Sequence, residues 1–502
     1  IVQFHVRAVD GSGAAATFPA RGADSGALYM VEDGQANFAR GHNFRLILSP
    51  ANRNLLHAFT NVMSNDDLPG TVIYNETRPY YDMGIRLKGS QRGRYSDTRT
   101  SFHLTFQPDD LFRGVHPVML IDRSGAGDAT NDRQKEILIK HMLNRAGGIP
   151  GLYSDLCRVI APLSKHTSSA ILSPRHEDEF VATAFDNGSD GIIYELELIY
   201  YPTSADSGGY KNPQPDNVLG VDIQNLGDDK ELYRYNFILH NHRDADDYRP
   251  FMAFAKTLGL SDTAALEARA PSVMDVSEWL RAWAHVTLCG VGDSYTFGNN
   301  HNLLMYSRPS DQKILAFPVD MDFSFVRGTS DSLVGDQNLS RVINRPTNLR
   351  VFYAHILDII DNAYNTTYMN SWIAHYNSFV PDQSFSAISS YIQARGNYAK
   401  STINSAGGNT AFSIASSLIN TSNNLITLSG TAPVQVSYLT VNGIAYPMTW
   451  STISAWRLNL TVTNPTNLLV VEAFDLHGQP LANYTRTVTV HYTGPVASPE
   501  GA

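Results

Sequence analysis

The pattern of apolar and polar positions changes along the chain and predicts different kinds of structure in different regions. Alternation with period two at residues 84–89 and 101–106 indicates strands that bury one face. Apolar positions three and four residues apart dominate the middle of the chain and predict helices. These helices are expected at 131–148, 246–258, 276–288 and 349–364. From about residue 410, short alternating segments return, separated by turn sequences such as Asn442-Gly443.

This succession predicts an α+β protein of three parts. Residues 1–80 are β-rich and irregular, and we expect them to pack on the following domain. Residues 81–405 contain strands, then helices, then a hairpin and further helices, an order typical of a two-lobed α+β domain. Residues 410–502 carry short strands at spacings of about eight to twelve residues. Such spacing predicts a small all-β sandwich of immunoglobulin-like type that folds on its own.

The first predicted pair of strands carries a concentration of positive charge. Alternation places Ile85 and Leu87 on the buried face and sends the neighbouring cations to the other face. Five cations lie within fourteen positions of an otherwise acidic chain: Arg86, Lys88, Arg92, Arg94 and Arg99. The loop 89–94 suits a phosphate group because it combines backbone amides with guanidinium groups. An ordinary exposed hairpin loop has the same composition, so both interpretations stay open.

The segment 292–325 carries the strongest chemical signal. Asp293 precedes an Asn cluster that ends at Asn302, two apolar strands joined by a turn follow, and the paired carboxylates Asp320 and Asp322 come next. Phosphoryl transfer needs a carboxylate to deprotonate the attacking hydroxyl, and amide and carboxylate oxygens to hold metal ions on the nucleotide phosphates. The order of residue types meets this need. Loop and capping residues also produce such a pattern, so spacing alone does not decide between the two.

The same segment resembles the CotH kinase-like family of spore-coat proteins. Members of that family carry an Asp, then His-Asn followed by an apolar strand and Tyr, then a Pro-x-Asp-x-Asp-x-x-Phe block. The corresponding residues here are Asp293, HNLLMY at 301–306 and PVDMDFSF at 318–325, and the resemblance extends over roughly 80–400. It implies a kinase-like domain that binds ATP with Mg²⁺ or Mn²⁺ and transfers phosphoryl to a protein hydroxyl.

The resemblance also implies roles for single residues. Asp293 takes the place of the catalytic base, and Asn302, Asp320 and Asp322 take the places of the metal ligands. The expected basic face is then directed toward Asp320, with Arg86, Lys88 and Arg99 as the candidates for binding the phosphates.

Two small-lobe positions depart from the family pattern. Arg99-Thr100-Ser101 stands where the family tends to have Lys-Lys-Ser, and Ser173-Pro174-Arg175 stands where it tends to have a Glu. Lys88 or Arg99 is then the replacement for the missing lysine, although Arg is a weaker stand-in. The candidates for the missing acid are Glu136, Glu177 and Glu179. These departures leave a second function open, a catalytically inactive kinase-like module with a structural or adhesive role in a large surface protein.

Composition narrows the class of protein and its partners. Of the 502 residues, 43% are hydrophobic and only 17% are charged, below the usual share of about a quarter. This balance favours a secreted or cell-surface protein. A net charge of −10 without a basic run argues against nucleic acid as a partner. A Ca²⁺-binding adhesion domain is a third interpretation, but the Asp-rich turns lack the spacing of an EF-hand.

The remaining sequence features concern processing and compartment. Cys157 and Cys289 allow at most one disulfide, and their apolar neighbours favour buried thiols instead. No apolar run reaches eighteen residues, so no membrane span is expected. The chain begins at Ile1 in a strand-like sequence without a signal peptide. We therefore expect a processed protein or a piece of a longer polypeptide or assembly.

Overall fold

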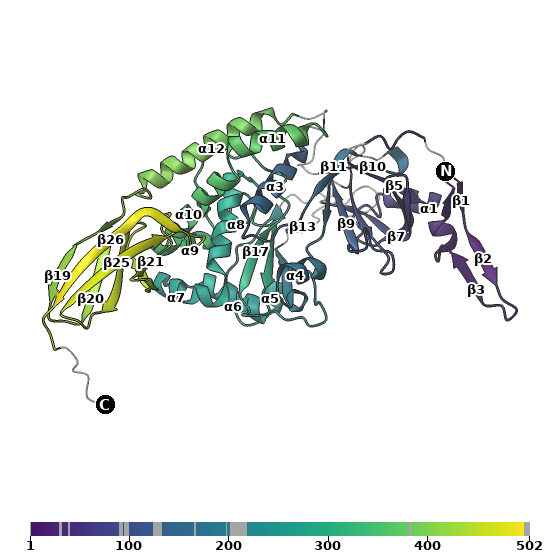
Figure 1. The fold of residues 1–502 in the computed structure, drawn as a ribbon. Coiled ribbons are helices and arrows are strands. Elements are labelled where there is room, and N and C mark those ends of the chain that lie inside the picture. Colours follow the sequence, from purple (N-terminus) through teal and green to yellow (C-terminus); the bar gives the residue numbers. More distant parts are fainter. Residues whose placement is uncertain are drawn as a thin grey trace.

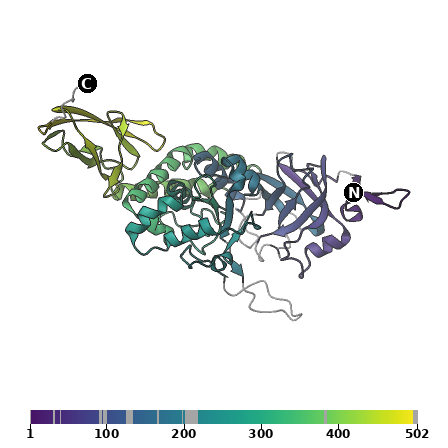
Figure 2. The same ribbon diagram turned by 90° about the horizontal axis from the view of Figure 1, so that it is seen from below.

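The computed structural model describes residues 2–29, 33–38, 41–89, 94, 100–123, 133–164, 167–196, 198–200, 218–380 and 384–495. The molecule is elongated and mixed α+β, as predicted. An N-terminal hairpin projects from one end, a β-barrel and a helical body follow, and a second β-rich region forms the other end (Figure 1). The same order is visible from below (Figure 2).

The N-terminal strands form two small antiparallel pairs. Strand β1 (Val2–Phe4) pairs with β4 (Ala27–Tyr29), and β2 (Val6–Val9) pairs with β3 (Ala15–Phe18) in the projecting hairpin. The short 3₁₀ helix η1 (Gly22–Ser25) lies between them along the chain. Ser25 hydrogen-bonds to the Gly70 carbonyl at 3.0 Å, which ties this region to the barrel.

The next strands close into a barrel in the order β10-β11-β9-β8-β7-β6-β5. Their bounds are β5 (His42–Leu48), β6 (Leu68–Tyr74), β7 (Arg78–Lys88), β8 (Ser101–Thr105), β9 (Val118–Asp122), β10 (Asp155–Ile160) and β11 (Thr167–Pro174). Closure depends on the parallel pairing of β5 with β10. The boundary predicted near residue 80 is wrong in structural terms, because β6 and β7 pair across it within one barrel.

The predicted strand pair at 84–106 is confirmed. Strands β7 and β8 run antiparallel from the Gly84–Thr105 pair to the Lys88–Ser101 pair. Ile85 and Leu87 are buried in the barrel core, as their alternation requires. The same core contains Cys157, and Cys289 is buried in the helical body, so both cysteines are free thiols.

The helical body contains a four-stranded sheet with the order β15-β12-β16-β17. These strands are β12 (Ile192–Leu196), β15 (Phe237–Leu239), β16 (Leu303–Ser307) and β17 (Ile314–Pro318). Strands β16 and β17 form the predicted hairpin. Two short strands, β13 (Ile199–Tyr200) and β14 (Val218–Leu219), pair with each other and lie between β12 and β15 in the sequence.

The helices have the following bounds: α1 (Pro50–Leu56), α3 (Glu136–Ala146), α4 (Asp178–Ala184), α5 (Glu231–Arg234), α6 (Arg249–Leu258), α7 (Thr263–Val273), α8 (Val276–Leu288), α9 (Asn338–Ile343), α10 (Pro346–Asn362), α11 (Thr366–Asn377) and α12 (Ser386–Ser405). Helix α8 matches its prediction because Asp275 caps it, accepting a hydrogen bond from the Glu278 amide. Helix α6 begins later than predicted, at Arg249, where Pro250 occupies the first turn. Among these described helices, none has the length and apolarity that crossing a membrane requires.

Two sheets enclose one apolar core in the C-terminal region. One has the order β18-β20-β24-β23 and the other β19-β26-β25-β21-β22. Their strands are β18 (Ser413–Ile414), β19 (Leu418–Thr421), β20 (Leu425–Thr431), β21 (Tyr438–Val441), β22 (Ile444–Ala445), β23 (Met448–Trp450), β24 (Ala455–Thr461), β25 (Thr466–Phe474) and β26 (Pro480–Tyr492). The region is all-β, as predicted from its alternating segments, and its immunoglobulin-like type stays a prediction.

A buried arginine, Arg350, helps to join this C-terminal region to the helical body. Arg350, on α10, is 2% exposed and donates hydrogen bonds to four backbone carbonyls at 2.5–3.3 Å. The acceptors are Ala432, Pro433, Val436 and Ile453. Its guanidinium also lies 3.5 Å from the centroid of the Trp450 ring. Burial lowers the pKa of Arg350 to about 9, so the side chain is still charged at neutral pH.

Replacing Arg350 by Ala is therefore expected to destabilise the junction by about 3 kcal/mol or more, since four buried carbonyls lose their donor. The matched control is Arg457→Ala, because Arg457 lies exposed on β24 of the same region. Urea unfolding followed by tryptophan fluorescence measures both free energies. Equal values for the two variants would contradict the assigned role of Arg350.

Candidate functional site

The open end of the β16–β17 hairpin brings the predicted residues together. Leu303 pairs with Pro318, so Asn302 and Asp320 flank the hairpin just beyond its last pair. The Asn302 side-chain amide donates to the Asp293 carbonyl at 2.9 Å and to the Asp320 carbonyl at 3.3 Å. One side chain thus joins the loop before the hairpin to the loop after it.

Both flanking residues adopt backbone conformations that are uncommon for residues other than glycine. Asn302 has φ of 59° and Asp320 has φ of 48°. The left-handed region costs most residues about 1–2 kcal/mol, although Asn and Asp tolerate it best. The surrounding hydrogen bonds hold this strain in place, and strained backbone of this kind is frequent at functional sites.

The Asp293 loop is fixed by backbone contacts with the segment that follows Asp320. The Gly292 amide donates to the Phe323 carbonyl at 2.9 Å, and the Phe325 amide donates to the Cys289 carbonyl at 2.8 Å. The Asp293 side chain is 28% exposed, and its Oδ2 lies 3.5 Å from Nε2 of His301. Asp293 is thus held beside the hairpin end with its carboxylate accessible.

Lys88 approaches Asp320 from the barrel. It forms an ion pair with Asp122 at the end of β9, and Asp122 also accepts a hydrogen bond from the Ser101 hydroxyl at 3.1 Å. Burial alone would lower the pKa of Lys88, but Asp122, Asp320 and Glu136 more than offset this effect and raise it. Lys88 is therefore a permanent positive charge facing the Asp320 carboxylate.

Asp320 is exposed to solvent, although the surrounding protein partly removes water from its carboxylate. Its side chain is exposed to solvent, yet the surrounding protein desolvates it enough to raise its pKa to about 6. Lys88 opposes this rise in pKa, whereas Asp122 and Glu136 add to it. We use the word recess for this region, in which Lys88 and Asp122 of the barrel and Glu136 of the helical body act electrostatically on Asp320.

The rest of the predicted basic face is used elsewhere. Arg86 lies 3.5 Å from Asp67 and 3.4 Å from the Asn65 amide oxygen. Arg94 is buried and donates to the carbonyls of Gly89 and Ser64. These two arginines connect the 64–67 loop to the end of β7 and the residues that follow it. The expectation that they face Asp320 is therefore wrong, because the contacts described here are with other residues. Arg92 and Arg99 lie outside the described residues.

The structure distinguishes the three acids considered as partners for the lysine. Glu136, the first residue of α3, is 3% exposed and acts electrostatically on both Lys88 and Asp320. Glu177 instead pairs with Arg175 at 2.7 Å, and Glu179 is exposed. Glu136 is thus the acid brought to the recess.

Asp322 lies two residues beyond Asp320 and is half-buried. Its role as a metal ligand stays a prediction. Within the described part of the chain, no three His, Cys, Asp or Glu side chains are grouped as a set of metal ligands. Asn302 and Asp320 instead offer one amide and one carboxylate.

Sequence reasoning missed two acidic residues of the recess, Asp122 and Glu195. The Glu195 carboxylate, on β12, is close enough to Lys88 and Arg175 for both cations to lower its pKa. Each acid ends or interrupts an apolar strand, in VMLID at 118–122 and IIYEL at 192–196. That signal was available, but only strand pairing brings these segments together.

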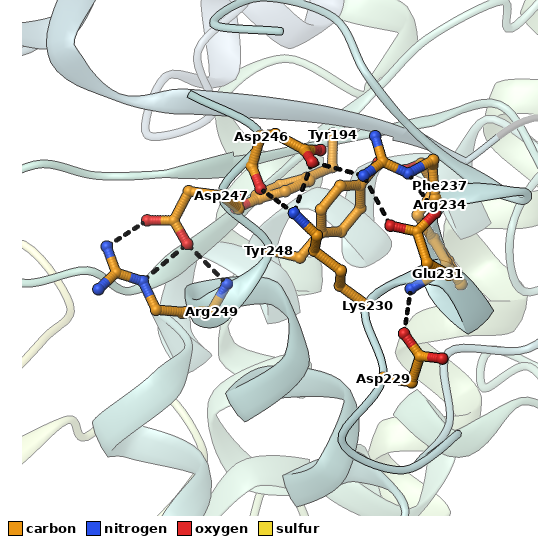
Figure 3. A network of polar contacts seen from close by, with 10 residues as sticks. All are labelled: Tyr194, Asp229, Lys230, Glu231, Arg234, Phe237, Asp246, Asp247, Tyr248 and Arg249. Carbon is orange, nitrogen blue, oxygen red and sulfur yellow. Dashed lines mark hydrogen bonds and ion pairs between the residues drawn. The ribbon is translucent and has the colours of Figure 1, made fainter. Parts of the chain in front are cut away.

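A surface hollow of about 560 Å³ lies elsewhere, around the loop that precedes α6. Its charged side chains pair with each other, as Figure 3 shows: Asp246 accepts from Lys230 and Arg234, and Asp247 accepts from Arg249. These pairs fix the loop between β15 and α6. We therefore regard the network as structural support.

A large part of the chain, including the hairpin, matches a known protein family. Residues 176–425 match the model described as CotH kinase protein. The match begins later than the resemblance noted from residue 80, and it includes Asp293, Asn302 and Asp320. A search of curated proteins found no match. The region from 176 to 425 of this chain belongs to the CotH kinase protein family.

Proposed function

We propose that this chain is a secreted or cell-surface kinase-like protein that binds ATP with Mg²⁺ or Mn²⁺ and transfers phosphoryl to a protein hydroxyl. The observation that carries the proposal is the Asn302 amide, which holds Asp293 and Asp320 on either side of one hairpin end. Family membership supports the same conclusion.

The side chains present fit a hard divalent cation. Mg²⁺ is usually held by one or two carboxylates together with substrate phosphates. Asp320 supplies a carboxylate, and the amide oxygen of Asn302 accepts no hydrogen bond from the described residues while its nitrogen is engaged. Asp322 is the proposed further ligand. When bound, the metal ion would neutralise charge on the phosphates.

The remaining steps fall to residues of the chain itself. Lys88 would bind phosphate oxygens with its ammonium group, which Asp122 orients through the ion pair and which the charges of Asp122 and Glu136 keep protonated. Asp293 would accept the proton of the attacking hydroxyl, with His301 Nε2 lying 3.5 Å from its Oδ2. Preorganised charges of this kind are the main source of catalysis in phosphoryl transfer.

A second function is favoured by one specific observation. Lys88 is already engaged with Asp122, and Asp122 is held in turn by Ser101. A lysine satisfied in this way suits a kinase-like fold that serves as a structural or adhesion module. Such a module requires no release of Lys88 toward phosphate.

Titration calorimetry of the chain with ATP distinguishes the two functions. We expect a binding heat at millimolar ATP that depends on Mg²⁺ or Mn²⁺ and disappears when EDTA is present, because the carboxylate and the phosphates share the metal. If no metal-dependent heat is found, the enzyme proposal fails and the inactive module replaces it.

A further inference from the structure

Glu195 and His240 form a pair at the edge of the recess. His240 Nδ1 lies 3.2 Å from Glu195 Oε2, and their side chains are 5% and 32% exposed. Nε2 of His240 is buried and hydrogen-bonds to no described residue, so the ring has one partner, the carboxylate. This arrangement fits the tautomer in which Nδ1–H donates to Glu195. His240 therefore holds one carboxylate oxygen in place.

The second carboxylate oxygen of Glu195 has no hydrogen-bond donor among the described residues. Oε1 of Glu195 accepts no hydrogen bond from the residues that the structure describes, and the side chain is one-third exposed. Burial alone would raise the pKa of Glu195, but His240, Arg175 and Lys88 lower it. Glu195 thus presents a charged, oriented acceptor to the recess.

Strand register fixes the distance of this acceptor from the proposed metal ligands. Glu195 pairs with Leu304, two residues after Asn302 on the neighbouring strand. Strand spacings of about 4.8 Å across and 3.3 Å along the sheet place Glu195 about 8 Å from Asn302 between Cα atoms. That separation is on the scale of the distance between the phosphates and the nucleoside of one nucleotide.

The pair is held rigidly on both sides. The His240 amide donates to the Ile193 carbonyl at 2.8 Å, which continues the pairing of β12 with β15. The Tyr194 hydroxyl donates to the Asp247 carbonyl at 2.7 Å, inside the charged network of Figure 3. The network therefore supports the loop that carries His240, and rigid support is what a recognition residue needs.

We infer that Glu195 binds a hydrogen-bond donor of the nucleoside, either a ribose hydroxyl or the amino group of the base, and that His240 is its positioning residue. The inference rests on the proposed function. It assigns to the recess a nucleoside subsite beside the phosphate subsite formed by Lys88 and Asp320.

Calorimetry with two probes tests this assignment, Mg²⁺-ATP and Mg²⁺-tripolyphosphate, which lacks a nucleoside. In Glu195→Gln we expect ATP affinity to fall roughly tenfold or more relative to tripolyphosphate affinity, because a hydrogen bond to a charged acceptor is lost. Removing a negative charge should by itself strengthen the binding of both polyanions and leave the ratio of their affinities about unchanged. The ratio of the two affinities is therefore the readout.

Glu177→Gln is the matched control, because Glu177 pairs with the same Arg175 that acts on Glu195 and, in the described part of the chain, forms no hydrogen bond with His240. Its ratio should equal that of the unmodified chain. His240→Leu should lower the ratio severalfold, and His240→Asn should restore part of it by replacing the donor. Inosine, 2′-deoxyadenosine and 3′-deoxyadenosine triphosphates identify the donor, since the analogue that lacks it becomes insensitive to Glu195→Gln.

Each outcome is distinct. If the unmodified chain binds neither probe, the proposed function and this inference both fail. If it binds both probes and Glu195→Gln leaves the ratio unchanged, the inference fails while the proposed function stands. Retained tripolyphosphate binding shows that a variant is folded.

Discussion

Replacing Asp293 by Asn is expected to reduce phosphoryl transfer by a factor of about 10²–10⁴ while ATP affinity stays within about twofold. A base acts on the acceptor hydroxyl, so its loss affects the chemical step more than the binding of the nucleotide. The isosteric change keeps the Asp293 carbonyl that accepts from Asn302. Transfer is measured with radiolabelled ATP, and affinity by calorimetry.

Asp336→Asn is the control for this experiment, because Asp336 is exposed in the segment following the site and loses the same charge. It should transfer phosphoryl at the rate of the unmodified chain. A variant at Asp293 that keeps full transfer would exclude this residue as the base.

The Asp320→Asn variant should lose metal-dependent ATP binding, with at least a tenfold drop in affinity, because a full negative charge disappears beside the divalent cation. Binding of ATP without metal should stay the same or improve slightly, since the repulsion between Asp320 and the phosphates also disappears. Calorimetry with and without Mg²⁺ separates the two effects.

The closed end of the same hairpin supplies a matched control. Asp311 pairs with Arg308 there, and Asp311→Asn makes the same change of charge far from the recess. Its metal-dependent affinity should match that of the unmodified chain. If Asp320→Asn and Asp311→Asn behave alike, Asp320 is not a metal ligand.

Local features of the fold were predictable from the sequence. The bounds of α8 follow from its capping Asp275 and its apolar spacing, and the β16–β17 hairpin follows from two apolar runs around a turn. The β7–β8 pair follows from period-two alternation. In each case the information lies within about thirty residues.

Long-range pairing was not predictable in this way. Barrel closure pairs Cys157 with His42, and neither strand carries a signal for the other. The boundary near residue 80 was therefore misplaced. The same limit hid Asp122 and Glu195, because each pairs with a strand that is distant in the sequence: Asp122 with Ile171 and Glu195 with Leu304.

The residues of the candidate site were likewise predictable only where they lie close together in the sequence. Asp293, Asn302 and Asp320 were identified because one short segment contains all three. The basic face was predicted as a unit, but its members meet different neighbours. Lys88 reaches the Asp320 side, whereas Arg86, two residues earlier, meets the 64–67 loop.

Because Lys88 and Asp320 lie in different parts of the fold, a bound nucleotide would affect how cooperatively those parts unfold. Lys88 belongs to the barrel and Asp320 to the helical body, so a nucleotide held by both would act as a clamp between two units. A ligand that binds only the folded arrangement adds about 2.7 kcal/mol to its stability at a hundred times its dissociation constant. In the proposed complex the barrel and the helical body would then melt as one unit.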